Sequence, residues 1–466
     1  MCPRQVACIE QPEPLAKPCA LSHDVLKTLY GDCELSLDPA LRDRITAAVS
    51  EGFAAQVAFT QELVRCPSTR GNEHTAQDLM SHAMRTRGLA MDIFGMDHAA
   101  IAAHPGGSRI TESHSTAPIV VGIHRPQSET GRSLILQGHV DVVPPGPADM
   151  WSTLPFDPVI RDGWLYGRGA GDMKAGVASQ MFALDALARI GLQPAATVYL
   201  QSVVEEEATG NGALMTHLRG YRAEAALIAE PGQETLTRAN LGVLWFQIEM
   251  RGHPVHVANM GEGENAIDAA WRVIGALRKL EARWNEAAAS DPLFSAAKHP
   301  LNLNVGRIEG GDWASSVPAW CRVDCRIGFL PGVAAADAAR EVEDCVADFA
   351  ASDRFLSNNP PRVTFNGFFA EGYRLEPGSD AELVLARAHQ KVMGAPLESR
   401  LATAYLDARV YALYNHIPVL NYGAIAEDYH ACDERVNLAS LERTTAVIAQ
   451  FIAEWCGVEP LVRPQA

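Results

Sequence analysis

Five residues able to bind a divalent metal ion are spread along the sequence, and most of them follow an apolar run. They are His139, Asp172, Glu207, Glu230 and His430. His139 ends the run SLILQGH, Glu207 ends a glutamate triplet after residues 196–204, and Glu230 follows residues 225–229. Imidazole nitrogens and carboxylate oxygens are zinc ligands. Because the carboxyl ends of parallel strands share one edge of a sheet, the pattern predicts a metal site at that edge.

This inventory of side chains is sufficient for two ions. Two ions about 3.5–4 Å apart need a bridging carboxylate, a bridging water and terminal ligands on each ion. Asp172, in the glycine-rich stretch GRGAGDMK, is the expected bridge. Asp141 is two residues from His139, on the same side of an extended strand, and is expected to hold the imidazole tautomer. Glu206 adjoins a ligand and is the expected general base for the metal-bound water.

The elements that position these residues are read from hydrophobic periodicity. Apolar runs predict strands at 90–94, 118–124, 133–137, 196–204 and 225–229, and helical periodicity predicts helices at 47–64, 73–87 and 174–190. Strands that alternate with helices are typical of βαβ units. We therefore expect an α/β fold, with a mostly parallel sheet flanked by helices.

The pattern of elements changes near residue 239. The order strand, helix, strand, strand, helix, strand then predicts an inserted α+β domain at 241–366. A helix at 380–393, a strand at 417–422 and a helix at 438–455 follow, so the first domain resumes. We expect a metal-binding catalytic domain formed by 47–240 and 367–466, preceded by an N-terminal extension at 1–46.

Composition restricts the class of protein. A chain of 466 residues favours two domains, and 47% hydrophobic with 20% charged residues is typical of a folded, soluble protein. The formal charge of −17 argues against nucleic acid and anionic membranes as partners. Ten cysteines without a CxxC pair indicate reduced thiols. With neither an export signal nor a membrane-spanning run in the sequence, we expect a cytoplasmic protein that acts on a small molecule.

Several motifs occur in register and together carry a family resemblance. GHVDVVP, GRGAGDMKAG, VVEEEATGNGA, AEPG, RGHPVH and EDYHACDERV resemble the M20 metallopeptidase family over roughly residues 53–456. The family includes acetylornithine deacetylase, succinyl-diaminopimelate desuccinylase, aminoacylase and glutamate carboxypeptidase. The resemblance implies a hydrolase with two divalent ions, zinc first and cobalt or manganese as alternatives. It also implies a smaller lid domain through which the protein forms a homodimer.

The same resemblance implies roles for individual residues. It assigns the five ligands named above, with Asp172 bridging, and Glu206 as the base. His256 matches a lid histidine that reaches the partner subunit's site and stabilises the tetrahedral oxyanion. Arg326 matches an arginine that grips a substrate carboxylate. The expected reaction is hydrolysis of the amide bond of a small N-acylated amino acid or related amide.

Two alternatives remain beside this deacylase activity. One is a dipeptidase or carboxypeptidase of the same family, and the other is a non-catalytic, ligand-binding homologue. The complete ligand set and Glu206 argue against the second, because a binding protein needs no general base. Departures from the family pattern at ASSVP (314–318), LDAR (406–409) and GAIAEDY (423–429) leave the substrate open. Within LDAR, Asp407 and Arg409 are expected to be architectural.

Overall fold

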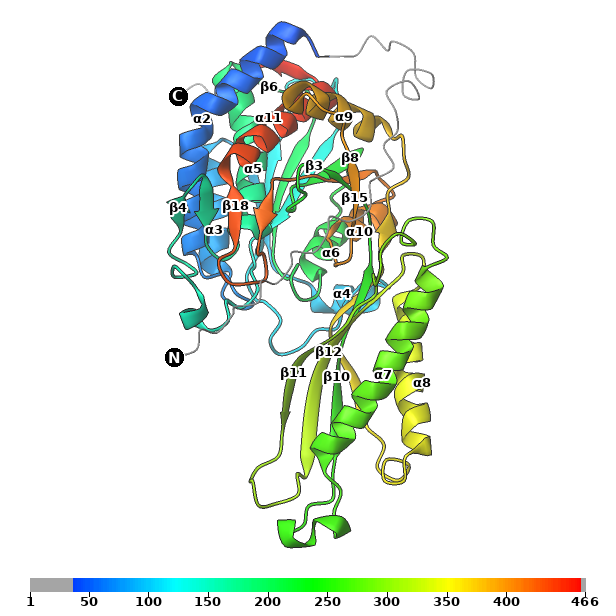
Figure 1. The fold of residues 1–466 in the computed structure, drawn as a ribbon. Coiled ribbons are helices and arrows are strands. Elements are labelled where there is room, and N and C mark those ends of the chain that lie inside the picture. The colour runs from blue at the N-terminus through cyan, green and yellow to red at the C-terminus, as the bar shows by residue number, and fades with distance from the viewer. Residues whose placement is uncertain (1–36, 462–466) are drawn as a thin grey trace, which may run out of the picture.

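The computed structural model describes residues 37–461 and contains two main sheets, one above the other in Figure 1. Most of the N-terminal extension expected at 1–46, including Cys2, Cys8, Cys19 and Cys33, lies outside the described residues. The cysteines within the described residues are free thiols. Among residues 37–461, no helix is both long enough and apolar enough to span a membrane.

The larger sheet has six strands, and three of its five pairings are parallel. Its order is β1 (Ala90–Phe94), β2 (Ile119–His124), β7 (Val198–Val203), β3 (Leu134–His139), β8 (Ala225–Ile228) and β16 (Val419–Asn421). β7, β3, β8 and β16 run parallel, whereas β1 and β2 pair antiparallel at one edge. Every residue of β3 and β8 is buried, as expected for continuous apolar strands inside a parallel sheet. The expected α/β fold is confirmed.

Helices cover this sheet. α2 (Pro39–Arg65), α5 (Ala175–Arg189) and α11 (Leu438–Trp455) pack against one another, and α9 (Asp380–Met393) packs on α11. α3 (His74–Thr86) contacts β2, and α6 (Asn211–Leu218) contacts β7. α2 begins eight residues earlier than the predicted start at 47. The Asp38 side chain accepts a hydrogen bond from the Leu41 N–H, and Pro39 is the first helical residue, an N-terminal signal that the periodicity alone did not include.

Short elements connect the larger ones. The short helices are α4 (His98–Ala103), η1 (Ala148–Met150), η2 (Ala170–Lys174), α10 (Ala408–Val410) and η4 (Tyr411–Asn415). One small sheet has the order β17 (Ala426–Glu427), β18 (Arg435–Asn437), β5 (Trp164–Tyr166) and β4 (Val159–Arg161). A second has the order β14 (Tyr373–Arg374), β9 (Leu236–Asn240) and β15 (Ser399–Ala402), and the third pairs β19 (Val458–Pro460) with β6 (Leu192–Pro194).

The second main sheet is antiparallel and has its own core. Its order is β11 (Leu303–Gly310), β12 (Trp320–Phe329), β10 (Gly242–Arg251) and β13 (Arg362–Ala370). α7 (Ala266–Ala288) and α8 (Ala335–Ser352) pack on it, and the short helix η3 (Val257–Glu262) lies at the end away from the larger sheet (Figure 1). β13 continues to Ala370 and so crosses the boundary expected at 366.

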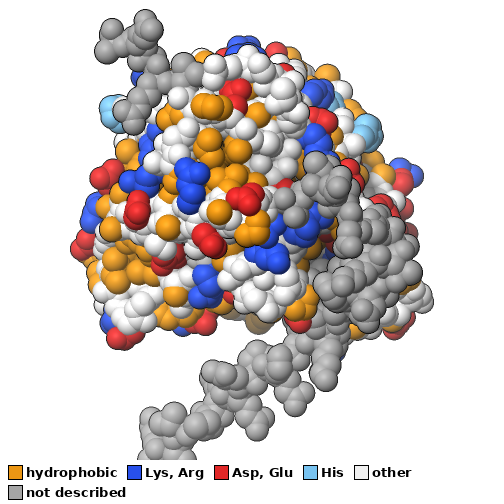
Figure 2. All heavy atoms as spheres, turned by 90° about the horizontal axis from the view of Figure 1, so that it is seen from above, with side chains coloured by type: hydrophobic (Ala, Val, Ile, Leu, Met, Phe, Trp, Pro, Cys, Tyr) orange, Lys and Arg blue, Asp and Glu red, His pale blue; other side chains and the backbone are white. Residues whose placement is uncertain are grey.

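Charged side chains are mixed on the surface. Figure 2 shows the molecule from above, and on the described part of this face Lys and Arg side chains are interspersed with Asp, Glu and apolar side chains.

Candidate metal centre

The carboxyl ends of three neighbouring parallel strands bring four of the predicted residues together. His139 is the last residue of β3, Glu206 and Glu207 follow β7, and Glu230 follows β8. Because these strands run in the same direction and lie side by side, their ends meet at one edge of the sheet. Asp172 reaches this edge from η2, and His430 from the loop between β17 and β18.

Among the described residues, three groups of side chains could hold an ion, and one of them consists of His139, Glu206 and Glu207. The other two groups share Asp172. In the first of these two, Nε2 of His139 lies 3.2 Å from Oδ1 of Asp172 and 3.6 Å from Oε1 of Glu230. In the second, Nε2 of His430 lies 3.0 Å from Oε2 of Glu207 and 3.5 Å from Oδ2 of Asp172. Within each group the ligand atoms lie within 4.8 Å of one another. Asp172 therefore directs one oxygen to each group, as a bridging carboxylate does.

The electrostatics of the cluster favour cations. Burial raises the pKa of the Glu206 and Glu230 carboxyls well above their usual range, and Oε1 of Glu230 is buried without a hydrogen-bond partner. The Glu207 carboxylate raises the pKa of His430 to about 11. Several carboxylates in one buried space ionise together only beside positive charge, which protons or metal ions supply. The donor set of imidazoles and carboxylates fits a pair of divalent cations.

A main-chain contact fixes the tautomer of His139. Its Nδ1 lies 2.9 Å from the carbonyl oxygen of Asp141, and a carbonyl only accepts, so Nδ1 carries the proton. Nε2 is then the atom with a free lone pair, and it faces Asp172. The Asp141 carboxylate, expected to hold this tautomer, lies 3.6 Å from Nδ1 and accepts a hydrogen bond from the Glu207 N–H at 3.0 Å. Asp141 thus joins the ends of β3 and β7.

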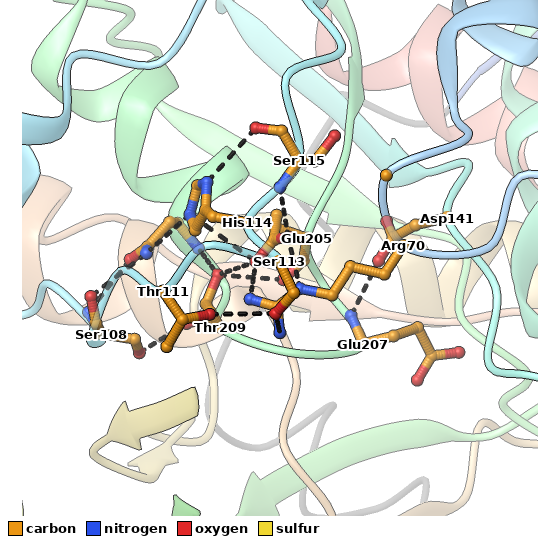
Figure 3. Close-up of polar contacts among 12 residues, drawn as sticks. Arg70, Ser108, Thr111, Ser113, His114, Ser115, Asp141, Glu205, Glu207 and Thr209 are labelled. Atoms are coloured by element: carbon orange, nitrogen blue, oxygen red, sulfur yellow. Dashed lines mark hydrogen bonds and ion pairs between the residues drawn. The ribbon is translucent and has the colours of Figure 1, made fainter. Parts of the chain in front are cut away.

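The three consecutive glutamates have three different environments. Oε2 of Glu206 lies 3.8 Å from Nε2 of His139, and Glu207 faces His430. Glu205 points away from the ligands and is fully buried in an ion pair with Arg70 (Figure 3). Neither Glu205 nor Arg70 was predicted as a site residue, because the two residues are far apart in the chain and no motif signals the pairing.

Glu434 is another buried residue that the sequence analysis missed. Its carboxylate accepts hydrogen bonds from the N–H groups of Gly169, Gly171 and Asp172, and it pairs with Arg168 at 2.5 Å. It therefore holds the loop that carries the shared aspartate. In the sequence Glu434 is one of several acidic residues near His430, and nothing distinguishes it from the exposed ones.

Two predicted site residues lie apart from the cluster. His256 is exposed, accepts a hydrogen bond from the Ala258 N–H, and precedes η3 at the far end of the second sheet (Figure 1). Arg326 is on β12, where its guanidinium donates to the carbonyl oxygens of Thr403 and Asn302 at 3.1 and 3.4 Å. Burial lowers the pKa of Arg326 to about 10, and no carboxylate of the described residues forms an ion pair with it.

Asp407 and Arg409 are buried in a polar network behind the cluster. Asp407 accepts hydrogen bonds from Gln137 of β3 at 2.7 Å and from the Tyr405 hydroxyl at 2.9 Å. Arg409 pairs with Glu371 at 3.0 Å and donates to the carbonyl oxygen of Gly106. The Gln137–Asp407 contact joins β3 to the last third of the chain, and Arg409 joins that segment to Glu371 and Gly106.

Comparisons with known proteins identify relatives in sequence and in fold. The N-formyl-4-amino-5-aminomethyl-2-methylpyrimidine deformylase of Bacillus subtilis is 30% identical over 360 residues, 73% of this chain and 83% of that protein. A succinyl-diaminopimelate desuccinylase of Cereibacter sphaeroides is 28% identical over 412 residues, 86% of this chain and 98% of that protein. The fold is similar to that of the dipeptidase Dug1p of Saccharomyces cerevisiae, with a TM-score of 0.72, 16% identity, and 89% and 98% of the two chains covered. Residues 135–454 match the model of Peptidase family M20/M25/M40, so the chain belongs to this family of hydrolases, as its motifs predict.

Proposed function

We propose that this protein is a metal-dependent hydrolase that cleaves the amide bond of a small N-acylated amino acid or related amide. The observation that carries the proposal is the sharing of Asp172 between two ligand groups, with Glu206 beside the first. The relatives named above, a deformylase and a desuccinylase, both remove an acyl group from nitrogen. Among acyl groups, the formyl group is therefore to be tested first, and the succinyl group second.

Two divalent ions would be held by the chain's own residues. His139, Asp172 and Glu230 would hold one, and Asp172, Glu207 and His430 the other. Zinc suits this mixture of imidazole and carboxylate best, with cobalt or manganese as alternatives. When bound, such ions supply Lewis acidity toward the acyl oxygen and lower the pKa of water to near neutrality.

Glu206 is the proposed general base. Its carboxylate forms no hydrogen bond with other described residues, so it is free to accept a proton from the attacking water. The carboxyl then carries this proton and returns it to the leaving amine nitrogen. The proton transfer and the cleavage of the C–N bond then restore the ionised base.

The second sheet is the proposed lid and dimer interface. We propose that this lid is the predicted insertion at 241–366, continued to the end of β13 at Ala370. The catalytic domain is the predicted 47–240 with the chain that follows β13, and it starts at Pro39, where α2 begins, so that the predicted extension at 1–46 is shortened. His256 would stabilise the oxyanion in the site of a partner subunit, because within one chain its segment lies far from the ligands (Figure 1). Arg326 would bind a carboxylate of the substrate, since its partly exposed guanidinium has no acidic partner among residues 37–461. A cytoplasmic homodimer is the proposed working form.

A substrate panel tests the function. N-formyl, N-acetyl and N-succinyl compounds and dipeptides would be incubated with zinc- or cobalt-loaded protein and with chelated protein, and release of the free amine measured. We expect metal-dependent release from one acyl class. Release from dipeptides alone would favour the peptidase alternative. A folded, metal-loaded protein that cleaves none of the compounds would contradict the proposal.

A further inference from the structure

Glu205, the first glutamate of the triplet, has hydrogen-bond partners within the protein for both of its carboxylate oxygens. Its carboxylate receives two hydrogen bonds from one guanidinium, from Nε of Arg70 at 2.7 Å and from Nη2 at 2.9 Å. The Ser115 N–H and the Thr209 hydroxyl donate to it at 2.8 Å each. Figure 3 shows Arg70, Ser115 and Thr209 converging on Glu205. A parallel, two-bond arginine–carboxylate pair of this kind restricts both position and orientation.

Glu205 also determines the path of the backbone behind the site. Its φ of 69° lies in the left-handed region, which a residue with a Cβ adopts only where its surroundings hold it there. Its carbonyl oxygen accepts hydrogen bonds from the N–H groups of Thr209 and Gly210 at 2.9 and 2.7 Å and so closes a tight turn. Glu206 and Glu207 lie inside this turn, so the place of Glu205 decides where the base and a ligand point.

The partner of Glu205 comes from a segment that also holds the other ligand-bearing strand. Ser68 donates its hydroxyl to the carbonyl oxygen of Val140 at 2.5 Å and accepts the Val142 N–H at 3.0 Å, while Thr69 forms a parallel bridge with Val142. His139 and Asp141 alternate with these residues. The segment 66–73 is thus bonded to the residues after β3 through Ser68 and Thr69, and to the turn after β7 through Arg70.

We propose that Arg70 is a positioning residue: through its two-bond pair with Glu205 it holds Glu206 and Glu207 in register with His139. This inference rests on the proposed function, because the register concerns the base and the metal ligands. Arg70 has no hydrogen bond or ion pair with the ligands. Its guanidinium also donates from Nη1 to the Ser113 hydroxyl at 3.2 Å, and it reaches the ligands through Glu205. Partners of this indirect kind typically change metal affinity or activity about 10–100-fold when they are removed.

A second arginine offers a matched control for the loss of an ion pair. Arg87, after α3, makes the same two-bond contact with Asp185 of α5, at 2.8 and 2.7 Å. The Arg87 and Arg70 side chains are equally exposed, at 24%, whereas Asp185 is 23% exposed and Glu205 is fully buried, so the two pairs are matched at the arginine. The Arg87–Asp185 pair joins two helices and has no contact with the turn or with the exit of β3. Arg87→Met therefore reports what a comparable ion pair contributes to stability alone.

The test compares Arg70→Met, Arg70→Lys and Arg87→Met with the natural protein. Zinc affinity is measured by titrating the chelated proteins with zinc. The kcat and KM are measured at saturating zinc with the best substrate of the panel, and the thermal midpoint is measured on the same samples. For Arg70→Met we expect about a 10–100-fold loss in zinc affinity and in kcat, with KM changed less than about threefold. Arg70→Lys keeps the charge but not the planar fork, so we expect an intermediate loss. Arg87→Met is expected to lower the thermal midpoint and to leave zinc affinity and kcat unchanged.

Each outcome bears on the proposal. If Arg70→Met does not fold, Arg70→Lys decides: a zinc affinity and a kcat equal to those of the natural protein would overturn the proposal. Losses in Arg70→Met no larger than those in Arg87→Met would overturn it as well. If the natural protein cleaves no compound of the panel, the proposed function fails, but the zinc titration still decides whether Arg70 positions the ligands.

Discussion

At the scale of single residues, the three consecutive glutamates differ in their surroundings although they are of the same type. Glu205, Glu206 and Glu207 are neighbours in the chain, yet Glu205 is neutralised by Arg70, Glu206 lies beside His139, and Glu207 faces His430. Only Glu206 combines burial with freedom from hydrogen bonds to the described chain. That combination suits a group that must accept and then release a proton.

Replacing Glu206 by Gln removes the proton acceptor and keeps the shape of the side chain. We expect kcat to fall about 10²–10⁴-fold, because general base catalysis contributes on that order, while zinc binding is retained. Enzyme assays paired with zinc analysis of the same samples check both points. A Glu206→Gln protein that remains fully active would remove Glu206 from its proposed role.

At the scale of elements, loops after strands are held by buried carboxylates from distant segments. Glu434, which directly precedes β18, accepts hydrogen bonds from three backbone N–H groups of the loop that carries Asp172 and pairs with the buried Arg168. Without Glu434, these buried N–H groups could not form hydrogen bonds with water in its place. The Glu434 carboxylate is therefore needed for stability as well as for the position of Asp172.

Glu434→Ala leaves the buried Arg168 guanidinium without an anionic partner, although Arg168 keeps its hydrogen bond to the Ala431 carbonyl oxygen, and leaves three N–H groups without their acceptor. We expect the free energy of unfolding to fall by about 3–5 kcal/mol, the usual loss when one member of a buried pair is removed. Denaturant unfolding of the chelated protein measures this loss. Glu427→Ala is the control, since its carboxylate pairs with Arg435 at 2.6 Å but is 47% exposed, and exposed pairs contribute about 0–1 kcal/mol. Equal losses in the two variants would contradict this account of Glu434.

The junction of β2 with β6 predicts a pH dependence of stability. Burial lowers the pKa of His124 below its ordinary value of 6.5, and Nε2 lies 2.8 Å from the carbonyl oxygen of Pro194. Because the unfolded chain takes up this proton at higher pH than the folded one, the contribution of His124 to stability is present above pH 6.5 and lost as pH falls below it. In His124→Gln the amide can donate to the same carbonyl without titrating. We expect the thermal midpoint of the natural protein to fall relative to this variant below pH 6.5; a difference that is independent of pH would refute the prediction.

At the scale of the whole molecule, the two sheets separate the proposed catalytic groups. The ligands lie at the edge of the larger sheet, whereas His256 precedes η3 at the distant end of the smaller one (Figure 1). In a symmetric dimer the same contact is made twice, so each lid can serve the site of the other subunit.

Mixing two inactive variants tests whether His256 acts between subunits. His256→Ala and Glu206→Gln are each expected to have low activity. When they are unfolded and refolded together, about a quarter of the sites combine an intact base with an intact histidine from the partner, as random pairing in a twofold dimer requires. We therefore expect about a quarter of the natural activity. Recovery no greater than the sum of the separate variants, with mixed dimers present, would exclude action between subunits.

Local signals in the sequence were sufficient to predict the bounds of some helices and strands. The strand at 90–94 and the helices at 380–393 and 438–455 have the predicted bounds. In α9, Ser379 caps the first turn and Gly394 ends the helix in the left-handed region. The family and the α/β fold also follow from the sequence, because motifs at strand ends recur in order along the chain.

The sequence by itself also determined which residue types stand at the ends of the central strands. Parallel strands place these ends together whatever the loops between them do, and for that reason His139, Glu207 and Glu230 could be grouped without coordinates. Only the tertiary structure decided their partners. The contacts of Glu205 with Arg70, Glu434 with the Asp172 loop, and Gln137 with Asp407 join residues 135, 262 and 270 positions apart. A buried charge finds its partner through three-dimensional packing, which local periodicity does not encode.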